Sequence, residues 1–333
     1  MTGTGWSAAP TPAAPASSGG ASARYGDAPA SFGGGPAPFG GGVFEAAATP
    51  PPWRLSFTGL LNAEWRKLAT MTSTWVLLGL AVLLGLLATG SGAVTGRAME
   101  EAISGPDAPT YVLVDRVSMA LAAGPVYPGL MMALLGVLAV TNEYSSGMIR
   151  ATLAATPARW PALAAKAIVV TGFAFVSTVV AEFVGALIAW ATLGNAVRFD
   201  LFDPDGLQVW LGSSLDVTLL ALMGLSVGVL VRGTAGAVVT QLLGLMLALP
   251  ALVLLIAGTV STSSESASQT ALTLFMHCPT VAAAMVYLGP IVGRDNLLSF
   301  SQGMTAAGAV ATMLVWTAVL LGGAFAVFQR RDV

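Results

Sequence analysis

Charged side chains are scarce in this chain, since Asp, Glu, Lys and Arg together make up only 9% of its 333 residues. An ordinary globular protein carries about 25%. Charges this sparse could not cover the surface of a soluble domain of the same length. Because 55% of the residues are hydrophobic, the composition instead predicts a membrane protein.

Cysteine, histidine and lysine are also rare, which excludes several kinds of site. The single cysteine, Cys278, excludes an intrachain disulfide, and His277 is the only histidine. A metal site needs three or four converging ligands, so none is expected. Neither lysine, Lys67 or Lys166, follows a glycine, so the chain has no P-loop with which to bind ATP. We therefore predict no catalytic site, no metal, no cofactor and no nucleic-acid partner.

The first 55 residues are rich in Ala, Pro, Gly and Ser. They lack the basic start and compact apolar core of a signal peptide, and they bury too little apolar surface to offset chain entropy. We therefore predict a disordered cytoplasmic tail over residues 1–55 and a membrane domain over residues 56–333.

Six stretches are long and apolar enough to cross a bilayer, which takes about 20 residues of helix. The predicted fold is an all-α membrane protein with spans near residues 75–94, 124–140, 167–191, 207–231, 234–258 and 304–328. A further apolar stretch, 266–293, is interrupted at His277–Cys278–Pro279. Proline and polar neighbours make a crossing costly there, so we expect two short re-entrant helices between spans five and six.

Basic residues set the expected orientation. With six spans and a cytoplasmic N-terminus, ten of the fourteen Lys and Arg residues lie inside and four outside, which agrees with the positive-inside rule. A seventh crossing would move Arg330 and Arg331 outside. Both termini are therefore predicted to be cytoplasmic.

The segment before span one, residues 57–75, suits an amphipathic helix that lies among the lipids of the inner interface. Its apolar residues recur at helical spacing, opposite three charged residues. The apolar set is Leu60, Leu61, Trp65 and Leu68, and the charged set is Glu64, Arg66 and Lys67.

The segment NEYSSGMIRATLAATPAR, residues 142–159, concentrates charge between two apolar spans. Residues 143–155 can form a short helix that Pro157 ends. One face would hold Tyr144, Met148, Ala151 and Ala155, and a more open face would hold Glu143, Gly147 and Arg150. Such a helix suits docking into a groove of a partner. The alternative is a solvated loop whose arginines only enforce topology.

Four motifs in this order resemble ABC type-2 transporter permeases, the membrane subunits of bacterial ABC exporters. The run EYSSGMIRATLAATPARWPALAAKA resembles the loop after the family's second span, and AEWRKLATMTSTW resembles the segment that leads into its first span. The VRGTAGAV link, Val231 to Val238, and the closing FQRRDV are also similar. The resemblance covers about residues 57–333.

This resemblance implies a permease subunit of an ATP-driven exporter in the bacterial plasma membrane. It implies two kinds of partner: a separate ATP-binding subunit and a second permease copy, identical or related. It also implies that the loop couples to the ATPase through Glu143, Tyr144, Gly147, Ile149, Arg150, Thr152 and Leu153. The transported substrate stays open.

Two acids, Glu182 in span three and Asp216 in span four, lie at similar depths from the outer side. An ionisable group inside a membrane suggests function. The pair could line a translocation path that prefers cationic cargo, could hydrogen-bond between helices as neutral acids, or could face a wet vestibule. A proton-coupled secondary transporter is the alternative function, although no repeat symmetry is visible. An intramembrane enzyme would have only this acid pair to use.

Overall fold

The computed structural model describes residues 56–103, 124–155, 159–193, 204–260, 265–295 and 304–330. Every structural statement below refers to these ranges, in which helices are present and strands are absent. The predicted tail, residues 1–55, lies outside them.

Six helical spans are long and apolar enough to cross a membrane, which confirms the predicted number. Five are single helices: α2 Thr72–Ile103, α4 Val126–Ser146, α6 Arg159–Leu193, α7 Pro204–Val231 and α12 Ala306–Arg330. The remaining span consists of α8 Thr234–Val239, a π-helix η3 Thr240–Ala248 and α9 Leu249–Val260. Helix α4 ends later and α6 begins earlier than expected, because backbone hydrogen bonding continues beyond the apolar run into polar residues.

The π-helical turn in the middle of span five was not predicted. Each residue in a π-helix bonds to the fifth residue along the chain, and such segments are rare. Thr280 Oγ1, from α11, donates a hydrogen bond to the carbonyl of Met246 within this segment at 3.2 Å. The distorted segment is therefore tied to a neighbouring helix.

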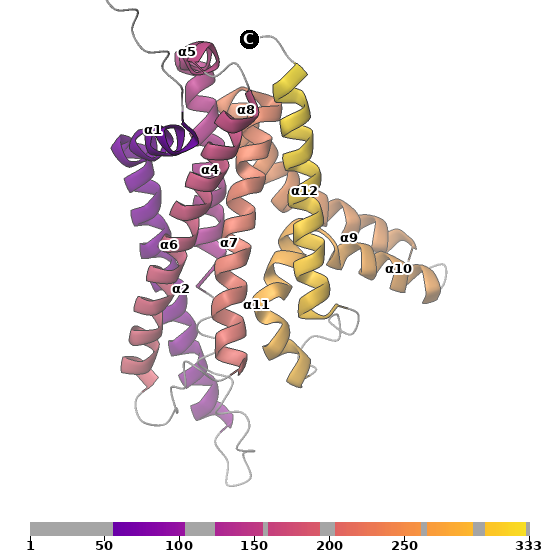
Figure 1. Ribbon diagram of the computed structural model, residues 1–333. Helices are drawn as coiled ribbons and strands as arrows, with labels where there is room; N and C mark the ends of the chain where they lie inside the picture. The colour runs from indigo at the N-terminus through magenta and orange to yellow at the C-terminus, as the bar shows by residue number, and fades with distance from the viewer. Residues whose placement is uncertain are drawn as a thin grey trace, which may run out of the picture. The chain divides into compact units, whose positions relative to one another are not determined.

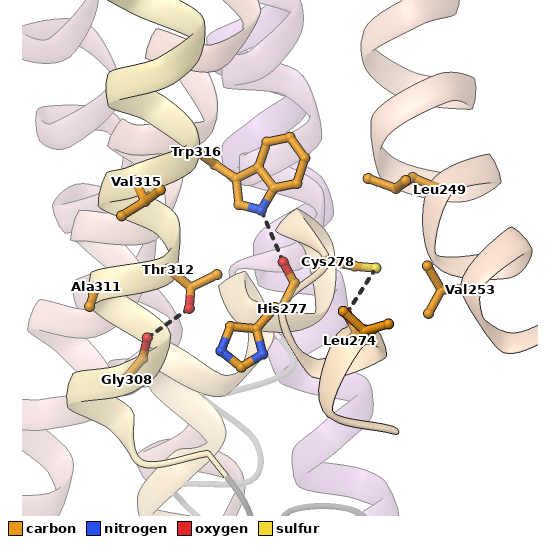
Figure 2. Close-up of a pocket in the computed structure, with 10 residues that line it drawn as sticks. All are labelled: Leu249, Val253, Leu274, His277, Cys278, Gly308, Ala311, Thr312, Val315 and Trp316. Atoms are coloured by element: carbon orange, nitrogen blue, oxygen red, sulfur yellow. Dashed lines mark hydrogen bonds between the residues drawn. The ribbon is translucent and has the colours of Figure 1, made fainter. Parts of the chain in front are cut away.

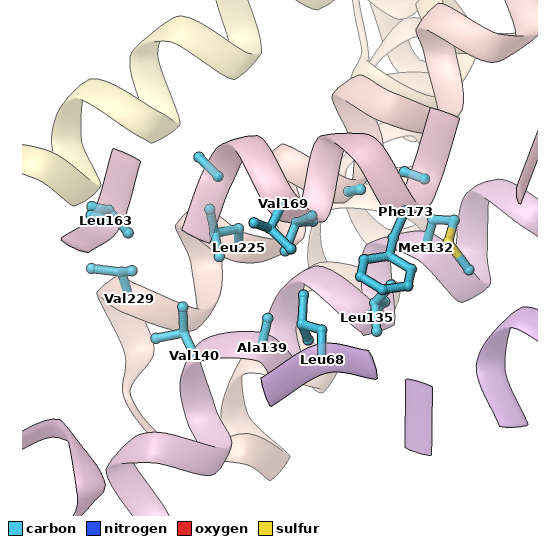
Figure 3. Packing of buried hydrophobic residues seen from close by; sticks show 14 of the residues in the cluster. Leu68, Met132, Leu135, Ala139, Val140, Leu163, Val169, Phe173, Leu225 and Val229 are labelled. Carbon is cyan, nitrogen blue, oxygen red and sulfur yellow. The ribbon is translucent and has the colours of Figure 1, made fainter. Parts of the chain in front are cut away.

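Helix α7 lies at the centre of the bundle and packs against α4, α6, α11 and α12 (Figure 1). The contact between α4 and α7 is close because glycines face it. A Cβ atom added to Gly136 would lie 2.0 Å from the Ala221 carbonyl oxygen, and one added to Gly224 would lie 2.0 Å from that of Ala133. Figure 3 shows the apolar core beside this contact, which includes Met132, Leu135, Val140, Leu163, Val169, Phe173, Leu225 and Val229.

Helix α1, Phe57–Thr70, lies across the end of the bundle at which α5 and the end of α12 also lie (Figure 1). Ser56 caps it, since its hydroxyl accepts a hydrogen bond from the Gly59 amide. The Trp65 ring stacks on Phe173 of α6, with 4.6 Å between centroids. Glu64 was expected on the polar face, but it is buried between Leu60 and Leu68. That expectation was wrong because lysines compensate the buried charge, as described below.

The stretch after span five forms two helices, α10 Glu265–Met276 and α11 Pro279–Asp295. The break falls at His277 and Cys278, where it was predicted, and the chain bends there by 80°.

Candidate functional site

Four charged side chains from three helices meet at the end of the bundle where α1 lies. Glu64 and Lys67 come from α1, Glu143 from α4 and Lys166 from α6. Lys67 Nζ lies 2.7 Å from Glu64 Oε1 and 2.9 Å from Glu143 Oε1. Lys166 Nζ lies 2.5 Å from Glu64 Oε2 and 2.8 Å from Glu143 Oε1. Each lysine thus bridges both glutamates, and this charge cluster joins the three helices.

Three of the four members of the charge cluster are buried. Glu64, Glu143 and Lys166 expose 1%, 5% and 6% of their surface, whereas Lys67 is half-buried. Burial disfavours the charged form of Lys67, but hydrogen bonds to both glutamates and their negative charges outweigh it, so the pKa of Lys67 is raised. Each charge therefore depends on the others, because a buried charge without a partner is strongly destabilising.

The charge cluster was not predicted from the sequence. Lys166 and Glu64 are 102 positions apart, and Lys67 and Glu143 are 76 apart, so no local spacing joins them. One signal was available: the chain has only two lysines, and both lie just outside apolar spans.

Gly147 separates this cluster from the short helix α5, Met148–Ala155. It ends α4 with a φ of 71°, in the left-handed region that glycine adopts without strain. The single helix expected over residues 143–155 is therefore two pieces, and Glu143 and Tyr144 belong to the last turns of α4. Helix α5 begins immediately after Gly147 and takes its own direction (Figure 1).

The residues proposed to couple to an ATPase divide into two groups. Gly147 and Arg150 are exposed, as is Met148 beside them, whereas Glu143 and Ile149 are buried. Tyr144, Thr152 and Leu153 are half-buried, and Tyr144 and Leu153 pack against the main core. Glu143 was expected on an open face, but its charge is taken up inside the cluster. Arg150 is therefore the charge of this set that a partner could contact.

The link between spans four and five approaches the same region. Arg232 has a φ of 63°, which is uncommon for a residue other than glycine. Its guanidinium lies 5.6 Å from the centroid of the Tyr144 ring, a cation–π contact. The VRGTAGAV link is thus held against the last turns of α4, next to α5.

The two predicted membrane acids are brought together inside the bundle. Glu182 on α6 and Asp216 on α7 expose 8% and 3% of their surface, and each carboxyl lies within electrostatic reach of the other. Both oxygens of Glu182 and Oδ1 of Asp216 lack a hydrogen-bond partner among the described residues. The Ser213 hydroxyl lies beside Glu182 but outside hydrogen-bond geometry with either of its oxygens, and it donates to the Val209 carbonyl at 2.7 Å. Tyr287, buried on α11, lies within reach of both carboxyls, and sequence reasoning missed it.

A separate pocket of about 620 Å³ lies between α9, α10 and α12 (Figure 2). Its walls are mostly apolar, with Leu249, Val253 and Val315 among them. The Trp316 indole donates to the His277 carbonyl at 2.9 Å, which fixes α12 to the bend between α10 and α11. Within the described residues, no three His, Cys, Asp or Glu side chains gather as a metal site would require.

No protein-family model and no curated protein sequence matches the chain.

Proposed function

We propose that this chain is the permease subunit of an ATP-driven ABC exporter. One observation carries the proposal: helix α5, which exposes Met148 and Arg150, follows directly on a buried charge cluster that joins α1, α4 and α6. A force applied to α5 passes through Gly147 to α4, and through Glu143 to Lys67 on α1 and Lys166 on α6. These 333 residues contain no P-loop, so the proposal assigns ATP hydrolysis to a partner.

In this proposal, Met148 and Arg150 make the contact with the ATPase. Met148 offers an apolar side chain for a groove, and Arg150 offers a charge for an acidic rim; both are exposed. Glu143 transmits rather than contacts, since it is buried in the charge cluster. Closure of the ATPase pair then tilts α4, α1 and α6 together.

The same proposal also says which side of the membrane each part of the chain faces and where a second permease copy binds. α1, α5 and the end of α12 lie at one end of the bundle (Figure 1), and this end faces the cytoplasm of a bacterium. α1 rests in the inner interface, with Trp65 half exposed to lipid headgroups. The bent pair α10–α11 enters from the outer side and returns. A second permease copy covers part of span five and of α12, which both expose most of their apolar surface while span four is mostly buried.

Purification of the tagged chain from native membranes in mild detergent tests the proposal. We expect a soluble chain with a GxxxxGK[ST] motif and ATPase activity to co-purify. Arg150→Glu should weaken that association by about tenfold, equivalent to about 1.4 kcal/mol. Arg66→Glu is the matched control, because Arg66 is also exposed but lies on α1. If both variants retained the ATPase equally, α5 would not be part of the contact with the ATPase.

A preparation without ATPase, in detergent that preserves known ABC complexes, would contradict the permease function. The second candidate is a proton-coupled secondary transporter. It is favoured by one observation, the pair of buried acids without hydrogen-bond partners on α6 and α7.

A further inference from the structure

The buried acids of this protein are compensated in two different ways. Glu64 and Glu143 each accept hydrogen bonds from two lysines. Glu182 and Asp216 are similarly buried, but no ion pair to either is present among the described residues, and three of their four carboxyl oxygens have no hydrogen-bond partner there. Water does not compensate a group inside a bilayer as it would at a surface. The carboxyl groups of Glu182 and Asp216 could therefore accept hydrogen bonds that no described residue donates.

A neutral, hydrogen-bonded acid pair does not fit this geometry. Two protonated carboxyls on facing helices would donate to one another or to a carbonyl. Glu182 does neither among the described residues. The Ser213 hydroxyl lies beside it but outside hydrogen-bond geometry with either carboxyl oxygen, and it donates to the Val209 carbonyl. Buried polar groups are nearly always satisfied in native proteins, so an exception needs an explanation such as a missing ligand.

We propose that Glu182 and Asp216, together with Tyr287, bind the positively charged group of an organic cation. Three helices supply the site: α6, α7 and α11. The carboxyls would receive the charge, and the phenol ring would add the attraction of an aromatic face for a cation. This inference names organic cations as the class of transported substrate. Transport of the cation rests on the proposed function, whereas binding of the cation needs no ATPase.

An organic cation suits the site better than a metal ion. Ca²⁺ takes six to eight oxygen ligands and Mg²⁺ prefers a near-octahedral set, whereas no group of three possible ligands is present within the described residues. Both apolar and hydroxyl side chains surround the acids: Val209 packs on Tyr287, Leu219 and Leu220 are buried close to Asp216 in the chain, and the buried Ser213 lies beside Glu182. A mixture of apolar surface and a few polar groups is typical of sites for small organic ligands.

Equilibrium binding to the full-length protein in nanodiscs, with any chain that co-purifies, tests this inference. The probe is tetraphenylphosphonium, and the control is tetraphenylborate, which has similar size but opposite charge. We expect Glu182→Gln and Asp216→Asn each to raise the Kd for the cation by about tenfold or more. Ser226→Ala is the matched control, because Ser226 is buried on the same helix as Asp216, nearly three turns away. The Kd of this variant should not change. Failure of the cation to bind, or equal binding by the doubly substituted protein, would overturn the proposal.

A second measurement uses the unmodified protein, so it does not depend on how the variants fold. Dicyclohexylcarbodiimide reacts with carboxylic acids in apolar surroundings, and peptide mass spectrometry locates the adduct. We expect an adduct on Glu182 or Asp216 that tetraphenylphosphonium suppresses and tetraphenylborate does not. An adduct that the cation leaves unchanged would refute the cation site and favour a proton site. Loss of the ATPase with cation binding retained would reject the permease function alone.

Discussion

Lys166 is the residue on which the charge cluster depends most, because it is buried and bridges both glutamates. Lys166→Met keeps an unbranched side chain, one heavy atom shorter, and removes its charge. Glu64 and Glu143 would then share only the half-buried Lys67. Breaking a buried ion pair from one side costs about 3–5 kcal/mol, so we expect a loss of stability of about 3 kcal/mol or more. Thermal unfolding in detergent measures it.

Lys67→Met is the matched control for this prediction. Its side chain is 29% exposed, and Lys166 would still bridge Glu64 and Glu143 after the change. A smaller loss of stability is therefore expected. Combining Lys166→Met with Glu64→Gln should cost less than the sum of the two single changes, since the pair interacts directly. Additive losses would show that the contacts of the cluster contribute little to stability.

The sequence could not predict the charge cluster because its partners meet only in three dimensions. The helical spacing of residues 57–70 placed Glu64 on the polar side of an amphipathic helix. In the structure, Glu64 instead faces α4 and α6. There it meets Lys166, which lies 102 positions further along the chain. By contrast, Glu182 and Asp216 could be paired in advance, since each is a lone acid at the same depth of an apolar span.

The crossing of α4 and α7 makes a prediction at the scale of the helix pair. Gly136→Ala would place a Cβ atom 2.0 Å from the Ala221 carbonyl oxygen, closer than any real contact. The two backbones would have to separate, which removes packing from the centre of the bundle. We expect Gly136→Ala to lower the melting temperature in detergent and to reduce the yield of folded protein.

Gly172→Ala on α6 is the control, because a Cβ atom there would meet nothing within 4 Å. Alanine is the better helix former by about 1 kcal/mol, so this variant should be neutral or slightly more stable. Similar losses in both variants would mean that close approach at Gly136 is not what limits the packing of α4 on α7.

Apolar runs predicted the six spans because each must cover the thickness of a bilayer. They did not predict where the helices end, since α4 and α6 continue into polar residues that the bilayer does not constrain. Nor did they predict the π-helix of Thr240–Ala248, because its sequence TQLLGLMLA gives no sign of a changed hydrogen-bond period.

At the scale of the whole molecule, the bent pair α10–α11 determines in which direction α12, the next helix, crosses the membrane. Six spans put both ends of the membrane domain on one side, whereas a crossing by the bent pair would make seven and move the end of α12 to the other. The bend of 80° at His277 and Cys278 fits either a return to the same side or a single broken span. Arg330 at the end of α12 favours the cytoplasm, because basic residues are retained there.

Single cysteines placed at three exposed positions test this orientation in intact cells, after Cys278→Ala removes the native thiol. We expect a membrane-impermeant maleimide to label Gln269→Cys on α10 directly. Arg150→Cys on α5 and Gln329→Cys on α12 should be labelled only after permeabilisation, because six spans place both inside. Labelling of Gln329→Cys from outside, with Arg150→Cys protected, would show that α10 and α11 cross the membrane. α12 would then cross the bilayer in the opposite direction. Its C-terminal end could not then make the contacts with α6 that it makes at the end of the bundle.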